Sequence, residues 1–199
     1  MVNKTDKKSD KKRKLILSKA KQVFIRKGFA AVTMKDIIDE CKISRGGIYL
    51  YFQSVDELFM QVIIMHNKQK LKETIDYIDS SKSFSQLLDE YFLKQKKRLL
   101  NIDKSLLIAM YEYRFSHKEN YDKEFFYTQF INTKAIILEI LNYGVSSGSI
   151  SIKDLDCLAM NIVFFIEGIS MLGTAAGVSE EFIDTQINFI KEMIFSHLS

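Results

Sequence analysis

The chain has 199 residues, enough to bury a substantial core in one or two domains. It has no proline and only 8 glycines, which excludes proline-punctuated folds and favours long uninterrupted helices. Residues 1–59 carry 14 Lys and Arg against 7 Asp and Glu, whereas residues 60–199 carry 15 against 18. This asymmetry indicates that the N-terminal part meets a polyanion, for which DNA is the obvious candidate.

The basic N-terminus allows two interpretations. Residues 1–10 have nothing apolar to bury after Val2, so we expect a basic arm that begins disordered. The arm could reach DNA phosphates or the minor groove, or it could be a solvated leader. From about residue 11 to residue 27, the spacing of Ile16, Ala20 and Phe24 predicts an amphipathic helix that Gly28 ends as a left-handed cap.

The stretch from residue 33 to residue 59 predicts a helix-turn-helix followed by a third helix. Thr33, Ser44 and Ser54 can each cap a helix start, and acidic residues follow Thr33 and Ser54 by three positions. We expect helices over residues 34–40 and 45–52, joined by a short turn. In the second helix Arg45 and Tyr49 lie four apart on an outward face, which is therefore cationic and aromatic.

Gly46 and Gly47 stand in the first turn of that second helix, where each costs roughly 1 kcal/mol relative to alanine. One interpretation is that a base pair or phosphate approaches the helix start closely. The other is that the first turn tolerates glycine and that Gly46 only clears the preceding helix. The glycines alone do not decide between these two.

The remaining chain predicts a series of long amphipathic helices. They are expected over residues 54–77, from residue 83 or 84 to 100, and over 102–115, 121–143, 154–176 and 179–198. The basic run from Lys94 to Arg98 is expected to be a solvated face. Asp156, Asn161 and Glu167 interrupt the apolar segment near the C-terminus, so we expect no membrane-spanning helix and no membrane partner.

The N-terminal quarter resembles the TetR family of transcriptional regulators. The match is carried by Ile16, Leu17, Ala20, Phe24, Gly28, Phe29, Thr33, Ser44, Arg45, Gly46, Ile48, Tyr49, Phe52, Ser54 and Leu58. Two positions depart from the family pattern: Lys42 stands where the turn glycine is usual, and Val55 where a lysine is usual. The second departure puts one expected phosphate contact in doubt.

This resemblance implies a fold, a division into domains and a DNA-binding surface. The fold is an all-α N-terminal three-helix helix-turn-helix domain followed by a C-terminal helical bundle domain. The DNA-binding domain is expected over residues 1–54, and a helical ligand-binding and dimerisation domain over 55–199. Contacts to double-stranded operator DNA are expected from Thr33, Lys35, Ser44, Arg45, Gly46, Gly47, Tyr49 and Tyr51.

The resemblance also implies a ligand cavity and a homodimer interface in the C-terminal domain. An apolar or amphipathic small-molecule effector is expected among His66, Met110, Tyr113, Phe126, Phe130 and Phe165, although the same residues could simply fill a core. The dimer is expected to form a four-helix bundle from the last two helices of each copy. Its interface residues are Met160, Phe164, Gly168, Met171, Phe182, Gln186, Phe189 and Met193.

Enzyme interpretations are disfavoured. Residues 144–148 satisfy the G-x-S-x-G pattern of serine hydrolases, but a helical pattern enters them where that motif needs a strand, so we expect a glycine-capped helix end. No metal site, cofactor motif or secretory signal is expected, and two distant cysteines suit a cytoplasmic protein. The sequence therefore predicts a ligand-released homodimeric repressor without catalytic activity. The alternative is a DNA-binding structural or chromosome-organising protein of the same fold without an effector.

Overall fold

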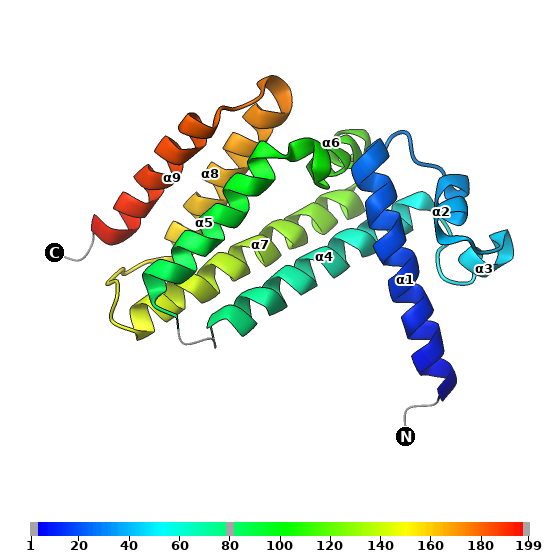
Figure 1. The fold of residues 1–199 in the computed structure, drawn as a ribbon, viewed down its shortest axis with the longest axis horizontal. Coiled ribbons are helices and arrows are strands. Elements are labelled where there is room, and N and C mark those ends of the chain that lie inside the picture. The colour runs from blue at the N-terminus through cyan, green and yellow to red at the C-terminus, as the bar shows by residue number, and fades with distance from the viewer. Residues whose placement is uncertain (1–3, 79–81, 197–199) are drawn as a thin grey trace. The chain divides into compact units, whose positions relative to one another are not determined.

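The computed structural model describes residues 4–78 and 82–196, and over these ranges the chain forms nine α-helices and a short 3-10 helix but no strand (Figure 1). The predicted all-α fold is confirmed. The chain divides into two compact units. Unit 1 comprises Met1–His66 and Asp103–Glu119, and unit 2 comprises Asn67–Ile102 and Asn120–Ser199.

This division differs from the predicted domain boundary between residues 54 and 55. Helix α4 (Val55–Ile78) begins in unit 1 and ends in unit 2, because its first turns supply core residues to the N-terminal helices. The segment 103–119, which contains helix α6 (Leu107–Ser116), also packs in unit 1 although it is distant in sequence. No local sequence signal marks this return of the chain.

Unit 1 is built on helices α1 (Lys4–Lys27), α2 (Met34–Cys41) and α3 (Arg45–Tyr49). Fully buried side chains come from each of them, including Phe24, Ile37 and Ile48. Phe59 of α4 packs edge-on against Phe24, with 4.8 Å between ring centroids. The predicted three-helix arrangement with α4 beginning after Ser54 is therefore present.

Helix α1 begins earlier than predicted. It starts at Lys4, whereas the sequence predicts a helix from about residue 11 and a disordered start to the arm over residues 1–10. Once the apolar side at Ile16 and Ala20 is buried, the helix can extend backwards through lysines, which are good helix formers. The expectation of disorder is thus wrong for residues 4–10, and residues 1–3 lie outside the described part.

Helix α6 is fixed to the rest of unit 1 by a carboxylate. The Glu112 side chain accepts hydrogen bonds from the backbone N–H groups of Phe29 and Ala30, the second at 2.9 Å. Gly28 has φ 75° in this turn, and an added Cβ would lie 2.4 Å from a Glu112 carboxylate oxygen. Gly28 therefore meets two demands, a left-handed backbone and the close approach of Glu112.

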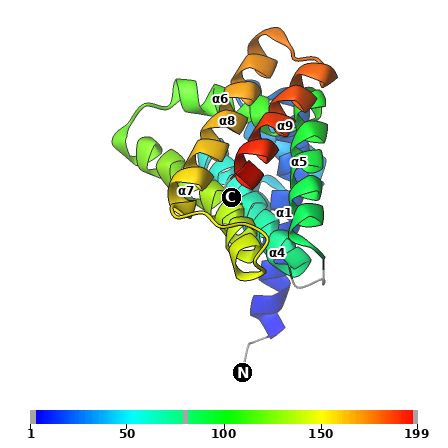
Figure 2. The ribbon, with the colours of Figure 1, turned by 90° about the vertical axis from the view of Figure 1, so that its left-hand side faces the viewer.

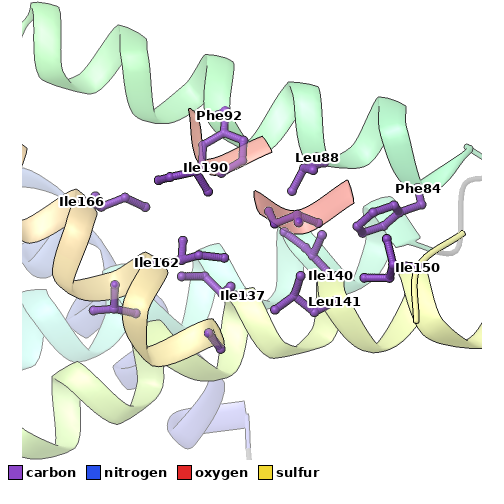
Figure 3. Packing of buried hydrophobic residues seen from close by; sticks show 13 residues of the cluster. Phe84, Leu88, Phe92, Ile137, Ile140, Leu141, Ile150, Ile162, Ile166 and Ile190 are labelled. Atoms are coloured by element: carbon purple, nitrogen blue, oxygen red, sulfur yellow. The ribbon is translucent and has the colours of Figure 1, made fainter. Parts of the chain in front are cut away.

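Unit 2 contains the last turns of α4 with α5 (Phe84–Leu100), α7 (Asn120–Ser146), α8 (Leu155–Ala176) and α9 (Glu180–Phe195). Figure 2 shows α5 beside α8 and α9. Figure 3 shows the core between them, where Phe92 of α5, Ile137 of α7 and Ile166 of α8 meet Ile190 of α9. Ser83, Asp154 and Ser179 cap three of these helices with their side chains.

The predicted 102–115 helix is broken. A 3-10 turn over Ile102–Lys104 precedes α6, which starts only at Leu107 and has no side-chain cap. Ser105 interrupts the run and its hydroxyl accepts from the Leu107 N–H at 3.2 Å. Local hydrogen bonding by serine competes with a helix in this way.

The G-x-S-x-G stretch is a helix end, as predicted. Helix α7 continues through Gly144 to Ser146, and Gly148 has φ 70° just beyond it. The N–H groups of Ser149 and Ile150 both bond to the Gly144 carbonyl. This geometry is a helix C-terminus and lacks the strand-to-helix elbow that a hydrolase serine needs.

Helix α8 is the one described helix that is long and apolar enough to cross a membrane. One side of it, with Ala159, Ile162 and Val163, is buried in the core of unit 2. Phe164, Met171 and Leu172 lie exposed on α8. One buried side of this kind is typical of a core helix at the surface of a helical bundle.

Candidate nucleic-acid interface

The turn between α2 and α3 contains a residue other than glycine with a strained, left-handed backbone conformation. Lys42 has φ 53° and ψ 45°, in the left-handed region, and its N–H bonds back to the Asp39 and Ile38 carbonyls to close α2. A side chain in this region costs roughly 1–2 kcal/mol, which glycine avoids. Lys42 is exposed and stands three residues before the first residue of α3.

The start of α3 is capped as predicted. The Ser44 hydroxyl accepts from the Gly47 N–H at 3.1 Å, and the helix proceeds from Arg45 to Tyr49. The predicted end at residue 52 is too late. The N–H groups of Tyr51 and Phe52 both bond to the Ile48 carbonyl, so the chain leaves α3 in a tight turn.

The outward side of α3 carries Arg45, which is exposed, and Tyr49, which is half-buried. The Arg45 guanidinium carbon lies 5.8 Å from the centre of the Tyr49 ring, within cation–π range. Ile48 on the other side is fully buried and anchors the helix. The helix thus presents a positive and a phenolic group from a fixed base.

No neighbouring atom of the protein explains why residue 46 is a glycine. A Cβ added there would meet nothing within 4 Å, so the alternative that Gly46 clears the preceding helix is wrong. Gly47 is different, because its added Cβ would lie 3.0 Å from the Ser44 hydroxyl oxygen and 4.0 Å from Lys12 Nζ. The open space beside Gly46 is solvent outside the protein, and a ligand bound to α3 would lie there.

Lys12 is a candidate contact that sequence reasoning missed. The Lys12 ammonium lies near the first turn of α3, 4.0 Å from the position that a Cβ would take at Gly47. Lys12 falls within the helix predicted from about residue 11, but the sequence does not show how closely that helix passes the start of α3. Arg13, by contrast, donates to Gln61 at 2.8 Å and covers the Phe52 ring, so it is engaged in holding unit 1 together.

Two of the three acidic residues of α2 are paired with bases of α1. Lys27 binds Asp36, and Arg26 binds Glu40 at 2.6 Å. The hydrogen bond from Lys27, followed by those from Thr33, lowers the pKa of Asp36 to about 2, and the hydrogen bond from Arg26 lowers the pKa of Glu40. These carboxylates remain ionised, but their charge is balanced locally and repels a polyanion less.

The other predicted DNA contacts occupy different positions. Lys35 is exposed in the first turn of α2 and Tyr51 is half-buried after α3. The Thr33 hydroxyl accepts from the Asp36 N–H and donates to the Asp36 carboxylate at 2.8 Å, so its hydrogen is already used. A structural role as a cap therefore accounts for Thr33 without DNA.

Residues after α3 fix the start of α4. Glu57 accepts from the Gln53 N–H at 2.7 Å, and Ser54 accepts from the Glu57 N–H at 3.0 Å. Val55 is the first helical residue and is half-buried. The position of the family's usual lysine is therefore partly exposed at the N-terminus of α4.

The six predicted pocket residues divide between the two units. His66, Met110 and Tyr113 belong to unit 1, and Phe126, Phe130 and Phe165 to unit 2. Tyr113 is fully buried, with its ring stacked 4.0 Å from that of His117 and close to Phe29 and Phe59. It is thus a core residue of unit 1, and the pocket stays a prediction.

Most of the predicted dimer residues form an exposed apolar set on α8 and α9. Phe164, Met171, Phe182, Phe189 and Met193 all expose more than a third of their surface, and Phe189 exposes 56%. Gly168 is also exposed, while Met160 and Gln186 are half-buried. Leu172, which the prediction omits, is 45% exposed.

Sequence comparison identifies the N-terminal region. Residues 16–62 match the family described as bacterial regulatory proteins, tetR family. The chain is 43% identical over 84 residues to the uncharacterized HTH-type transcriptional regulator YfiR of Bacillus subtilis (strain 168), covering 41% of each chain. It is 38% identical over 52 residues to YuxN of the same organism, covering 26% of this chain and 18% of that one. The chain thus spans less than half the length of these relatives.

Solved structures extend the likeness of fold to nearly the whole chain. NemR of E. coli in its reduced form has a TM-score of 0.76 at 12% identity, covering 94% of this chain and 99% of that one. FadR from Bacillus subtilis, in complex with stearoyl-CoA, has a TM-score of 0.69 at 16% identity, covering 93% and 98%. At these identities the likeness shows the fold alone.

Proposed function

We propose that this chain, which belongs to the TetR family of bacterial regulatory proteins, is a transcriptional repressor that binds operator DNA as a homodimer and is released by a small-molecule effector. The observation that carries the DNA-binding part is the outward side of α3. Arg45 and Tyr49 are presented together there, and Gly46 leaves room for close approach. In a helix-turn-helix the N-terminal residues of this second helix contact base edges in the major groove.

The roles of the individual groups follow from their chemistry. Arg45 suits a guanine edge or a phosphate, since its guanidinium offers several donors in one plane. The Tyr49 and Ser44 hydroxyls suit phosphates, and so do the Lys12, Lys35 and Lys42 ammonium groups. Phosphate contacts position the protein on DNA, whereas base contacts give it a preferred sequence.

The test of DNA binding uses a duplex selected from random sequence by the wild-type chain. Arg45→Ala should weaken binding to it by about 1–3 kcal/mol, measured by fluorescence anisotropy, with an unchanged thermal midpoint. Lys118→Ala is a matched control, since it removes an exposed positive charge from the end of unit 1 beyond α6. Equal affinities for wild type and Arg45→Ala would remove Arg45 from the interface.

The homodimer is supported by the exposed apolar set on α8 and α9. Side chains such as Phe164 and Phe189 leave large apolar areas in water, and monomeric proteins rarely keep such areas contiguous. Pairing α8 and α9 with a second copy would cover them in a four-helix bundle. Phe189→Glu should then sediment as a monomer and lose operator affinity. A wild-type chain that is already monomeric at micromolar concentration would contradict the dimer.

Release by an effector is supported by the fold and by one neighbour. FadR of Bacillus subtilis, which shares this fold, binds stearoyl-CoA. A ligand shifts this chain away from DNA only if it binds the DNA-free state more tightly. If no cavity ligand changed DNA affinity, the alternative of a structural DNA-binding protein without an effector would be favoured. Either protein would act in the cytoplasm and need no catalytic activity.

A further inference from the structure

The basic run of α5 is not the uniform solvated face that the sequence predicts. Lys96 pairs with Glu180 at 2.8 Å and Asp184 at 2.6 Å, both on α9. Lys94 lies over the Tyr77 ring, 4.4 Å from its centre. Arg98 is directed inwards, where it donates to the Ser170 hydroxyl of α8 at 3.3 Å. All of these residues belong to unit 2.

Arg98 has no ion-pair partner among the residues that the structure describes. Its Nε is buried and has no hydrogen-bond partner, and among the described residues no carboxylate lies within 4.0 Å of its guanidinium. Ser170 is fully buried, and its hydroxyl already donates to the Ile166 carbonyl at 2.7 Å. An arginine cannot discharge by losing a proton, so a neutral hydroxyl at 3.3 Å is weak compensation for partial burial.

A second polar group, the Tyr91 hydroxyl, interacts electrostatically with Arg98. Tyr91 lies two turns earlier on α5, and its ring packs edge-on against Phe92 with 5.4 Å between the ring centroids. Burial raises the pKa of Tyr91, while the Arg98 charge lowers it and the Glu167 charge raises it to smaller extents. Its hydroxyl is therefore a neutral donor near the guanidinium.

The residue that follows Arg98 and the residue that precedes Ser170 are both apolar. Leu99 follows Arg98 on α5, Ile169 precedes Ser170 on α8, and both belong to one buried cluster with Ile183 of α9. Phe165 of α8 packs against the same cluster. An arginine with an unpaired Nε–H donor beside an apolar cluster matches a ligand that has an anionic group and an apolar body.

We propose that Arg98, positioned by its hydrogen bond to Ser170 and assisted by Tyr91, binds the anionic oxygen group of the effector, a carboxylate, sulfonate or phosphate, with the apolar body of the ligand against Leu99, Phe165 and Ile169. This rests on the proposed effector control, and it assigns the effector a chemical class. The ligand supplies the negative charge that Arg98 lacks. Phe165 was predicted from the sequence as a pocket residue, whereas Arg98, Ser170 and Tyr91 were not.

The test compares two fluorescent probes that differ only in one anionic group, 1-anilinonaphthalene-8-sulfonate and neutral N-phenyl-1-naphthylamine. The wild-type chain should bind the sulfonate more tightly. Arg98→Met, which keeps the length and apolar stem of the side chain, should weaken sulfonate binding about 10- to 100-fold and change binding of the neutral probe less than about threefold. Equal effects on both probes, or no effect on either, would overturn the proposal.

Two further variants and one wild-type measurement keep the test decisive if Arg98→Met fails to fold. Arg98→Lys should keep a preference for the sulfonate because it keeps the charge. Glu167→Gln, which removes the carboxylate near Tyr91, should leave sulfonate binding equal or tighter. On the wild-type chain decanoate should displace the neutral probe at lower concentration than decan-1-ol does, and the reverse order would contradict an anionic site.

Failure of this proposal and failure of the proposed function give different results. If the wild-type chain binds an operator and replacing Arg98 changes the binding of neither probe, the anionic site is rejected and the DNA-binding function stands. Loss of the sulfonate preference in Arg98→Met, in a chain that selects no DNA, would establish the site and reject its role in a repressor. Circular dichroism melting of each variant separates lost binding from lost folding.

Discussion

Gly46→Ala should have opposite effects on folding and on DNA binding. Gly46 is the second residue of α3, and its added Cβ would meet nothing within 4 Å in the protein. The alanine therefore brings only its better helix propensity, a gain of about 0.5–1 kcal/mol. For a chain of this length that gain raises the thermal midpoint by roughly 1–4 °C. The same methyl group would stand where the proposed major-groove ligand of α3 approaches.

The expected cost in operator affinity is about 1–3 kcal/mol, or roughly 5- to 150-fold, because a methyl group displaces at least one contact of the first turn. Anisotropy titrations against the selected duplex, with melting curves of both proteins, measure the two effects. Gly47→Ala is the matched control, since its Cβ would lie 3.0 Å from the Ser44 hydroxyl oxygen and should not stabilise the helix. If Gly46→Ala were stabilised and still bound the operator like wild type, no DNA atom would approach the start of α3.

Three further predictions concern the stability of the protein, and one concerns its contacts with DNA phosphates. Lys42→Gly should raise the thermal midpoint by roughly 1–4 °C, because relief of about 1–2 kcal/mol of left-handed strain at φ 53°, less the entropic cost of glycine, leaves a net gain of about 0.5–1 kcal/mol, and a lower midpoint would contradict this. The pKa of Asp36 is lowered from 3.8 to about 2, so its contribution to stability is present above pH 3.8 and is lost as the pH falls towards 2. The midpoints of wild type and Asp36→Asn should accordingly converge over that window, and a constant difference would exclude the ion pair as its source. Glu112→Ala should cost about 2–3 kcal/mol and speed hydrogen exchange at the Phe29 N–H, and unchanged exchange would show that this bond does not hold the turn. Val55→Lys should steepen the dependence of log K on log salt by about 0.9 for each phosphate neutralised, whereas an unchanged slope with a lower midpoint would mean that Val55 serves packing.

Local signals in the sequence predicted most of the helix boundaries. Thr33, Ser44, Ser54 and Ser83 each accept from a backbone N–H at a helix start, because a hydroxyl at that position satisfies a donor that the helix leaves free. The apolar period likewise located the buried sides of the long helices. Such signals act over a few residues, and the sequence displays them directly.

Contacts between distant segments could not be predicted in this way. Glu112 binds a turn that lies 82 and 83 positions away, and nothing near it in the sequence distinguishes it from a solvated glutamate. Arg98 lies in a run of basic residues, and nothing in the sequence of that run indicates that Arg98 donates to Ser170. Lys12 lies within the predicted helix, but its approach to the start of α3 depends on how the two helices pack, which the local pattern does not show.

The most direct test of the central claim is to select duplex DNA from a random library with the wild-type chain and to sequence what is retained. A homodimer that reads DNA through α3 should enrich an inverted repeat whose half-sites lie one helical turn or a multiple of it apart, and Arg45→Ala should lose that enrichment. An enriched sequence without two-fold symmetry, or no enrichment over the starting library, would contradict the account.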